Sequence, residues 1–364
     1  MMNRNTWMRR GLALLLVICL LPITSAFTTD TDPSPLPADI WTVTFHWNHP
    51  GAPTGGIYSE ALVADGDLVP RPADPARVGW IFLGWFEAMG VVPLGEEVTL
   101  LGTSDFSAFF DFDTPITSDL NLYARWELEP KIPLAVRHYA YLIGDDTAFV
   151  RPGDHITRAE IATILFRLLD SSYRKYNWTN TNPFPDVYKG AWYNNAVSTI
   201  HAIGMLDGLP GGSFSPHASI TRAEFAVLVA ELFSLDAIGG GDVFLDISNH
   251  WARDAINLLA AAQILHVPED RLFHPEDFIS RAEVAAILNR TLGRIPQDTR
   301  DVSISGARVW QDNRNRDAWY YLDIQEATNS HDYEIKADQI HETWTALIPS
   351  PKWAAMQHED ATPG

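Results

Sequence analysis

A four-residue motif occurs three times after residue 150 of this 364-residue chain and constrains its fold more than any other feature. It is TRAE at residues 157–160 and 221–224 and SRAE at 280–283. Each copy follows a turn that contains an aromatic residue and a proline, and each precedes an apolar run with helical spacing. Because a unit repeated in this way buries its apolar face only against its neighbours, the pattern predicts an array of packed helical units.

A second signature alternates with the first. Phe-Pro-Asp at 184–186, Phe-Leu-Asp at 244–246 and Trp-Gln-Asp at 310–312 each lead to a tryptophan and an amphipathic segment. The first TRAE helix has no such segment before it, and the last such segment has no TRAE helix after it. Because a lone amphipathic helix of this length is marginal in water, we expect the chain ends to meet. That places four residues near the 157–169 helix, namely Trp319, Tyr320, Leu322 and Ile324.

The motif residues have an ordinary role as helix starters. A hydroxyl followed three residues later by Glu forms a capping box, which predicts helix starts at Thr157/Glu160, Thr221/Glu224 and Ser280/Glu283. Capping does not explain the arginine, because a cation in the first turn faces the positive end of the helix dipole. One explanation is packing or a salt bridge to the neighbouring unit, and the other is binding of an anion beside helix N–H groups. Both stay open for Arg158, Arg222 and Arg281.

The second signature also allows two interpretations. Its aspartates precede helices, where aspartate is more often a cap than a ligand; they are Asp186, Asp246 and Asp312. The aromatic residues of the repeats belong mostly to the core, but a flat ring at a groove edge also stacks against sugar faces. Both roles are therefore open for Trp192, Trp251 and Trp319.

The first part of the chain has strand-like patterns. WTVTFHW at 41–47 alternates β-branched and aromatic residues with others, and NLYARW at 121–126 does the same. The aromatic cluster GWIFLGWF at 79–86 lies between them. These segments predict a small, mostly β module over 41–127, followed by a linker over 128–133.

The N-terminus has the pattern of an export signal. Arg4, Arg9 and Arg10 precede an apolar run at 11–21 and small residues at 24–26, so we expect a signal peptide over 1–26 and a flexible leader over 27–40. Cys19 is the only cysteine and leaves with the signal, so the mature chain has no disulfide or cysteine metal site. No later stretch is apolar and long enough to span a bilayer.

Charge and motifs exclude several functions. The net charge of −20 disfavours a nucleic-acid partner. The chain has no HExxH, GxSxG or Walker motif and no nucleophilic cysteine. The twelve histidines are scattered without ligand spacing, and His46 and His49 at a strand end are expected to be satisfied or exposed. We therefore expect no enzyme activity, no cofactor and no metal.

Residues 134–333 resemble a set of S-layer homology repeats, the modules that anchor Gram-positive surface proteins to secondary cell-wall polysaccharide. The matching text is ITRAE at 156–160 and 220–224, ISRAE at 279–283, GMLDGLPGGSFSP at 204–216, IGDDTAFVRP at 143–152 and WYYLDIQEATNSHDY at 319–333. The resemblance implies an all-α pseudo-threefold bundle of three repeats, closed by a C-terminal half-repeat. It also implies that the motif arginines bind the anionic, pyruvylated sugar of the polymer; here these are Arg158, Arg222 and Arg281.

Residues 41–127 resemble, less specifically, the Listeria–Bacteroides repeat, which is also called internalin B-like. The matching text is VTFHWN at 43–48, GWIFLGWF at 79–86 and FDFDTPITSDLNLYARW at 110–126. The resemblance implies a small β-grasp-like fold that serves as a surface spacer or a weak interaction module.

We therefore expect a multidomain protein of the cell wall or S-layer surface that binds pyruvylated wall polysaccharide non-covalently. The helical part divides into the second half of the first repeat at 134–170, the second repeat at 184–234, the third at 244–292, a half-repeat completing the first at 310–333 and a tail at 334–364. The candidate binding residues are the motif arginines and the aspartates and tryptophans of the second signature. One alternative is a surface adhesin whose β module binds another protein; another is a non-catalytic subunit of a wall-glycan hydrolase.

Overall fold

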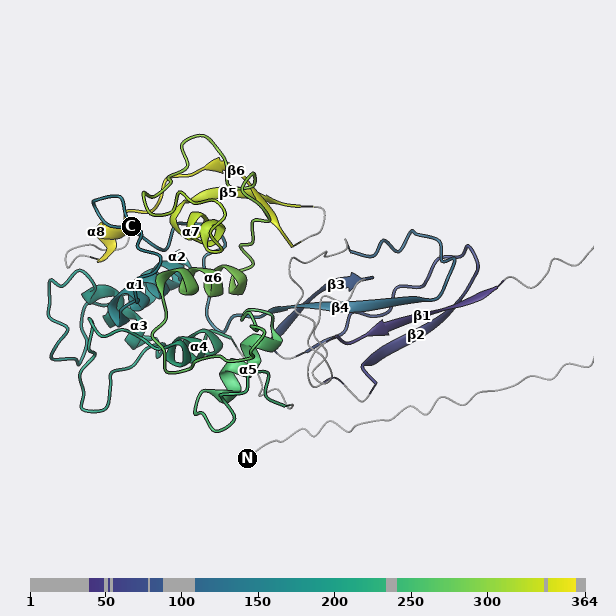
Figure 1. Ribbon diagram of the computed structural model, residues 1–364, viewed down its shortest axis with the longest axis horizontal. Helices are drawn as coiled ribbons and strands as arrows, with labels where there is room; N and C mark the ends of the chain where they lie inside the picture. The colour runs from purple at the N-terminus through teal and green to yellow at the C-terminus, as the bar shows by residue number, and fades with distance from the viewer. Residues whose placement is uncertain are drawn as a thin grey trace, which may run out of the picture. The chain divides into compact units, whose positions relative to one another are not determined.

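The computed structural model describes residues 39–48, 52, 55–77, 79–87, 109–233, 241–336 and 340–357 (Figure 1). The expected signal peptide, most of the leader, His49 and residues 358–364 lie outside these ranges. Within the described ranges, every helix is too short or too polar to cross a lipid bilayer.

A mixed four-stranded sheet forms the N-terminal module. Its strands are β1 (Ile40–His46), β2 (Ile57–Ala64), β3 (Trp80–Phe86) and β4 (Leu120–Leu128). The strand order is β2-β1-β4-β3, in which β1 and β4 are parallel and the two outer pairs are antiparallel. Because side chains alternate between the two faces of a strand, β1 directs Val43 and Phe45 into a core with Trp85 and Leu122. The two predicted strand segments are confirmed as β1 and β4, and the aromatic cluster forms β3.

Short helices are the main regular secondary structure of the C-terminal part that the structure describes. They are α1 (Arg158–Leu168), α2 (Ser171–Asn177), α3 (Asn194–Ala202), α4 (Arg222–Glu231), α5 (Arg253–Ala261), α6 (Arg281–Thr291), α7 (Tyr321–Thr328) and α8 (Trp353–Gln357). All three predicted capping boxes are confirmed, at the starts of α1, α4 and α6. In each box the Thr or Ser side chain accepts a hydrogen bond from the Glu N–H, and the Glu side chain accepts one from the cap residue.

Each capped helix packs against one helix of the second signature. The pairs are α1 with α3, α4 with α5 and α6 with α7. The last pair corrects one expectation, because Trp319 to Ile324 were placed near the 157–169 helix. Helix α7 instead covers α6, since α1 already buries its apolar face against α3.

Three buried isoleucines link the starts of α1, α4 and α6. Ile156, Ile220 and Ile279 each precede a capping residue directly and are at most 1% exposed. The Ile156 N–H donates to the Ile279 carbonyl at 3.1 Å, Ile279 to Ile220 at 3.1 Å, and Ile220 to Ile156 at 3.2 Å. These bonds satisfy buried backbone groups and join the three segments in a closed cycle.

The end of the chain contacts the segment before α1. The Gln311 N–H donates to the Ala148 carbonyl at 3.0 Å. The N–H groups of Tyr141 and Leu142 both donate to the Ala327 carbonyl, each at 3.0 Å. Residues 310–328 are therefore hydrogen-bonded to residues 141–151, although more than half of the helical part separates them in sequence.

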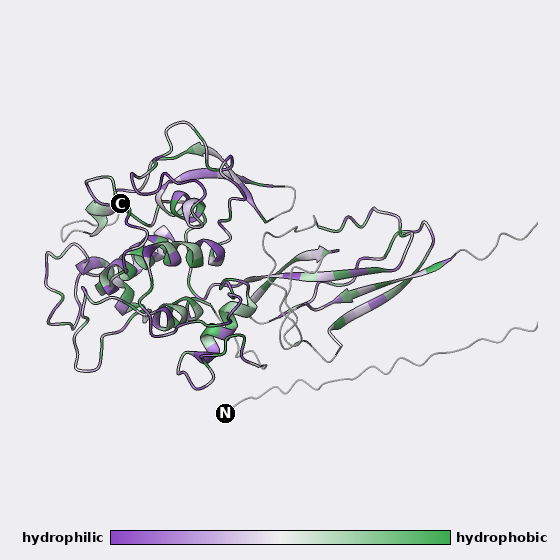
Figure 2. Cartoon of the chain, viewed as in Figure 1, coloured by the Kyte–Doolittle hydropathy of each residue, from purple (hydrophilic) through white to green (hydrophobic). Residues whose placement is uncertain are grey.

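The sequence predicted an all-α C-terminal part, but this part also contains two strands. An antiparallel hairpin of β5 (His331–Ile335) and β6 (Glu342–Leu347) follows α7. Its first strand, HDYEI, is predominantly hydrophilic (Figure 2). The sequence therefore lacks the apolar alternation that marks a half-buried strand. The first residue of each strand belongs to a buried polar cluster described below.

Candidate functional site

The arginine of each TRAE or SRAE motif reaches from its own helix to the aromatic–proline turn of another unit. We call these three residues the inner arginines. In each case Nε donates to a backbone carbonyl of the turn. The bonds are Arg158 to Phe214 at 2.8 Å, Arg222 to Phe273 at 2.7 Å and Arg281 to Val150 at 2.8 Å. The turns follow one another cyclically, so each helix start is attached to the next unit.

Two of the inner arginines are enclosed by protein. Arg158 is 5% and Arg281 is 6% exposed, whereas the Arg222 side chain is 23% exposed. Each buried guanidinium also donates to a second carbonyl, Arg158 to Asp207 at 2.6 Å and Arg281 to Ile143 at 2.8 Å. Burial lowers the pKa of both from the ordinary arginine value. Their donors are directed at the backbone, which limits access for a large external ligand.

The inner arginines also pair with capping-box glutamates of the neighbouring unit. Arg281 donates to Glu160 at 2.5 Å, and Arg222 donates to Glu283. Burial lowers the pKa of Arg158, and the nearby negative charge of Glu224 opposes that shift only in part. The Arg281–Glu160 and Arg222–Glu283 pairs are the salt bridges between units that the structural explanation of the arginines predicts. They offset the unfavourable position of a cation at a helix start.

The aspartates of the second signature do not cap helices, so the predicted capping role is wrong. The N-cap positions of α3, α5 and α7 are Tyr193, Ala252 and Tyr320. Each aspartate instead accepts two hydrogen bonds, at 2.7–3.0 Å, from backbone N–H groups of the turn that an inner arginine also holds. The pairs are Asp186 with Phe214 and Ser215, Asp246 with Phe273 and His274, and Asp312 with Val150 and Arg151.

We call these three residues the turn aspartates. Burial raises the pKa of Asp186 and of Asp246, but the turn N–H groups outweigh it, and both pKa values are lowered from the ordinary 3.8. Each turn is thus held by an arginine at its carbonyl and by a carboxylate at its amides. The structure brings one inner arginine and one turn aspartate together at every turn.

The three tryptophans of the second signature are exposed. Trp192 is 44%, Trp251 is 66% and Trp319 is 63% exposed. Each lies two residues before its helix and makes a ring contact with an adjacent residue; these are Tyr193, His250 and Tyr320. We call them the outer tryptophans. Their exposure excludes the core role, which was one of the two roles that the sequence left open. The aromatic residues that begin the second signature are the buried ones, namely Phe184, Phe244 and Trp310.

Basic side chains lie between each turn aspartate and its outer tryptophan, and the sequence analysis missed them. Lys189, Arg314 and Arg316 are exposed, and His250 is half-buried with Nε2 2.8 Å from Glu276. Their position in the sequence, between the aspartate and the tryptophan of the second signature, could have indicated them. We call residues 186–192, 246–251 and 312–319 the Asp–Trp loops.

The predicted histidine pair at the end of β1 is described only in part. His46 Nε2 lies 2.9 Å from Asn121 Oδ1, and its ring stacks on Tyr123 at 4.7 Å. The side chain is therefore satisfied within the sheet, as expected.

Comparison with known families identifies two of these units. Residues 183–226 and 243–285 match the S-layer homology domain. The chain carries two S-layer homology repeats. Each matched range contains one turn aspartate, one outer tryptophan and one inner arginine.

Curated relatives place the S-layer homology region at the cell wall or cell surface. The chain is 32% identical to Cell surface glycoprotein 1 of Acetivibrio thermocellus over 56% of its length, and 32% identical to the Cellulosome-anchoring protein of the same organism over 54%. It is 27% identical over 60% of its length to Amylopullulanase of Thermoanaerobacterium thermosulfurigenes. These alignments span 9%, 44% and 12% of the three relatives.

Proposed function

We propose that the chain anchors itself non-covalently to an anionic, pyruvylated secondary cell-wall polysaccharide and has no catalytic role of its own. Residues 134–170 and 310–333 together form a further S-layer homology repeat beside the two matched ones. The observation that carries the proposal is the repeated exposure of an aromatic ring at the same place in each unit, two residues before α3, α5 and α7.

Repetition makes a polymer the best-fitting ligand. Isolated exposed apolar side chains are ordinary on a protein surface, but three tryptophans at equivalent positions present the same flat face three times. A polymer with repeating sugars can occupy several such positions at once, and linked contacts bind far more tightly than a single one. This supports binding at the Asp–Trp loops rather than at one enclosed pocket.

Binding of an anionic polymer is favoured only by local positive side chains, not by the net charge of the chain. The chain's net charge of −20 repels an anion at long range. Lys189, Arg314 and Arg316 place positive charge within two of the Asp–Trp loops, and cationic side chains hold carboxylates by charge-assisted hydrogen bonds. The acidic pyruvyl group is the chemistry that they fit.

The inner arginines act mainly as positioning residues in this proposal. Arg158 and Arg281 fix the turns that flank the loops, because their donors are used by backbone carbonyls. Arg222 is the most exposed of the three and is the one able to add a direct contact with the polymer.

A second candidate function, protein binding by the β module, is favoured by a feature of the sheet. Strand β2 is an edge strand, and Ile57 and Leu62 on it are 44% and 75% exposed. Exposed sheet edges are templates for added strands. The strand order β2-β1-β4-β3 supports the resemblance to a β-grasp-like spacer or interaction module.

The direct test is co-sedimentation of the mature chain with purified pyruvylated wall polymer and with the same polymer after chemical removal of pyruvate. We expect binding to the first and at least tenfold weaker binding to the second, since a charge-assisted contact contributes about 1.5–3 kcal/mol. Equal binding to both polymers would show that the acidic group is not recognised. Binding to neither would overturn the anchoring function.

A further inference from the structure

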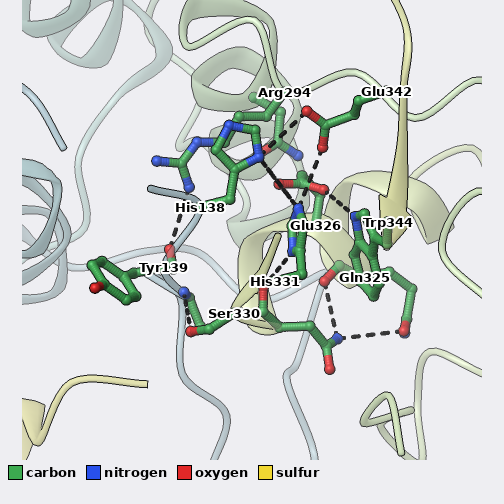
Figure 3. A network of polar contacts seen from close by, with 12 residues as sticks. His138, Tyr139, Arg294, Gln325, Glu326, Ser330, His331, Glu342 and Trp344 are labelled. Atoms are coloured by element: carbon green, nitrogen blue, oxygen red, sulfur yellow. Dashed lines mark hydrogen bonds and ion pairs between the residues drawn. The ribbon is translucent and has the colours of Figure 1, made fainter. Parts of the chain in front are cut away.

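Four titratable side chains converge in the interior beside the C-terminal hairpin, outside both matched repeats. They are His138, Glu326, His331 and Glu342 (Figure 3). They come from four segments: the stretch before α1, helix α7, the first residue of β5 and the first residue of β6. None is more than 5% exposed. Buried groups of this kind are normally paired or bound to a metal.

The spacing of the four side chains matches a tetrahedral metal site. His138 Nδ1 lies 3.3 Å from His331 Nε2, and Glu326 Oε1 lies 3.5 Å from the former and 3.3 Å from the latter. Glu342 Oε2 lies 3.3 Å from His138 Nδ1. One ligand atom from each residue lies within 4.8 Å of the other three. Ligands at about 2.0–2.1 Å from a tetrahedral Zn²⁺ are about 3.3–3.4 Å apart.

In His331 and Glu326, the atom that points away from the cluster is already hydrogen-bonded. His331 Nδ1 lies 2.9 Å from the Asn329 carbonyl, which only accepts, so Nδ1 carries the proton. In the neutral ring, Nε2 then presents its lone pair to the cluster. Glu326 Oε2 accepts from Trp344 Nε1 at 2.8 Å, which turns Oε1 inward. Outer hydrogen bonds of this kind orient the side chains that bind metals.

The inward carboxylate atoms are not satisfied by the protein. Glu326 Oε1 and Glu342 Oε2 are buried, and their only close polar neighbours in the described chain are the imidazole nitrogens of the cluster itself, at 3.3–3.5 Å. Two buried carboxylates at such short range repel each other, and leaving a buried acceptor unpaired is costly. A divalent cation at the centre provides both the missing charge and an acceptor for the four lone pairs.

We propose that His138, Glu326, His331 and Glu342 form a structural zinc site. A mixed set of two imidazoles and two carboxylates suits Zn²⁺ better than the all-oxygen cations Ca²⁺ and Mg²⁺. Four buried protein ligands leave no open position, which is typical of a structural rather than a catalytic zinc. The ion connects the stretch before α1 to α7 and to both strands of the hairpin, and so fastens the two ends of the helical part.

The first test uses the unaltered mature chain, purified without a histidine tag and dialysed against a weak chelator. We expect about one zinc per chain by mass spectrometry, and a melting temperature that falls with EDTA and recovers with Zn²⁺, because ligand binding to the folded state stabilises it. Replacement by Co²⁺ should give the visible absorption bands of tetrahedral coordination.

Variants separate a built site from surface binding. His331→Ala and Glu326→Gln should lose the bound zinc, whereas Asp332→Asn, an exposed carboxylate beside His331, should keep it. Trp344→Phe retains an aromatic ring next to His331 but loses the bond to Glu326, so zinc affinity should fall about 10–100-fold.

Two results would overturn the proposal. One is a wild-type chain that binds no zinc and whose melting temperature is the same in EDTA and in Zn²⁺; the cluster is then a polar network without a metal. The other is equal, weak zinc binding by wild type, His331→Ala and Asp332→Asn, which assigns the metal to scattered surface histidines.

Discussion

The inner arginines and the outer tryptophans are repeated with the same periodicity, yet they occupy different environments in the structure. Arg158 and Arg281 are buried, with Nε and a terminal nitrogen of each bonded to backbone carbonyls. Trp192, Trp251 and Trp319 are 44–66% exposed. A repeated residue is therefore not by itself a ligand site; what decides its role is whether its hydrogen-bonding groups are already used by the protein.

The largest expected effect on stability follows removal of a buried inner arginine. Arg281→Ala leaves the carbonyls of Val150 and Ile143 without their donor and removes the partner of Glu160. We expect a loss of about 3 kcal/mol in the free energy of unfolding, measured by urea denaturation.

Arg222→Ala is the matched control, because the Arg222 side chain is 23% exposed and water can replace part of what it loses. It should cost less than Arg281→Ala. If Arg281→Ala keeps its stability but no longer binds the wall polymer, the account is contradicted, and the inner arginines are the anion-binding site.

A turn aspartate should matter about half as much. Asp246→Asn removes one of two acceptors and places an amide donor against a backbone N–H of Phe273 or His274. We expect about 1.5 kcal/mol of destabilisation. Asp254→Asn is the control, since that carboxylate is 73% exposed and pairs only at the surface with Arg253. If both variants lose a similar amount of stability, the turn hydrogen bonds of Asp246 do not stabilise the fold more than a surface ion pair does.

The turn aspartates also predict how stability depends on pH. The pKa values of Asp186 and Asp246 are lower in the folded chain than the ordinary 3.8, so these two turn aspartates stabilise the fold above that pH. The contribution is lost as pH falls below 3.8 through the folded pKa values. The double variant Asp186→Asn/Asp246→Asn should show a flatter decline in this range. If the free energy of unfolding of this variant falls with pH below 3.8 as steeply as that of the wild type, the pKa shifts are contradicted.

Several elements could be predicted because their causes are local. The capping boxes place a hydroxyl and a glutamate three residues apart, and this spacing alone predicted the starts of α1, α4 and α6. The strands β1 and β4 could be predicted because β-branched and aromatic residues alternate in WTVTFHW and NLYARW. The structure places Val43, Phe45 and Leu122 from these segments in the core. Such signals depend on adjacent residues and need no knowledge of the tertiary fold.

The missed features depend on contacts between distant segments. The turn aspartates precede helices and resemble caps, but their partners at Phe214 and Phe273 lie 28 and 27 residues further along. The proposed zinc ligands lie at 138, 326, 331 and 342, a spacing that matches no short motif. The hydrophilic strand β5 likewise gives no apolar alternation, so only the folded chain reveals its pairing with β6.

The most direct test of the account combines two measurements on one protein, the triple variant Trp192→Ala/Trp251→Ala/Trp319→Ala. Because the outer tryptophans are exposed, the free energy of unfolding should change by only about 1 kcal/mol in total, while co-sedimentation with pyruvylated wall polymer should fall by tenfold or more. A variant that unfolds like wild type and still binds the polymer like wild type would contradict the proposed site.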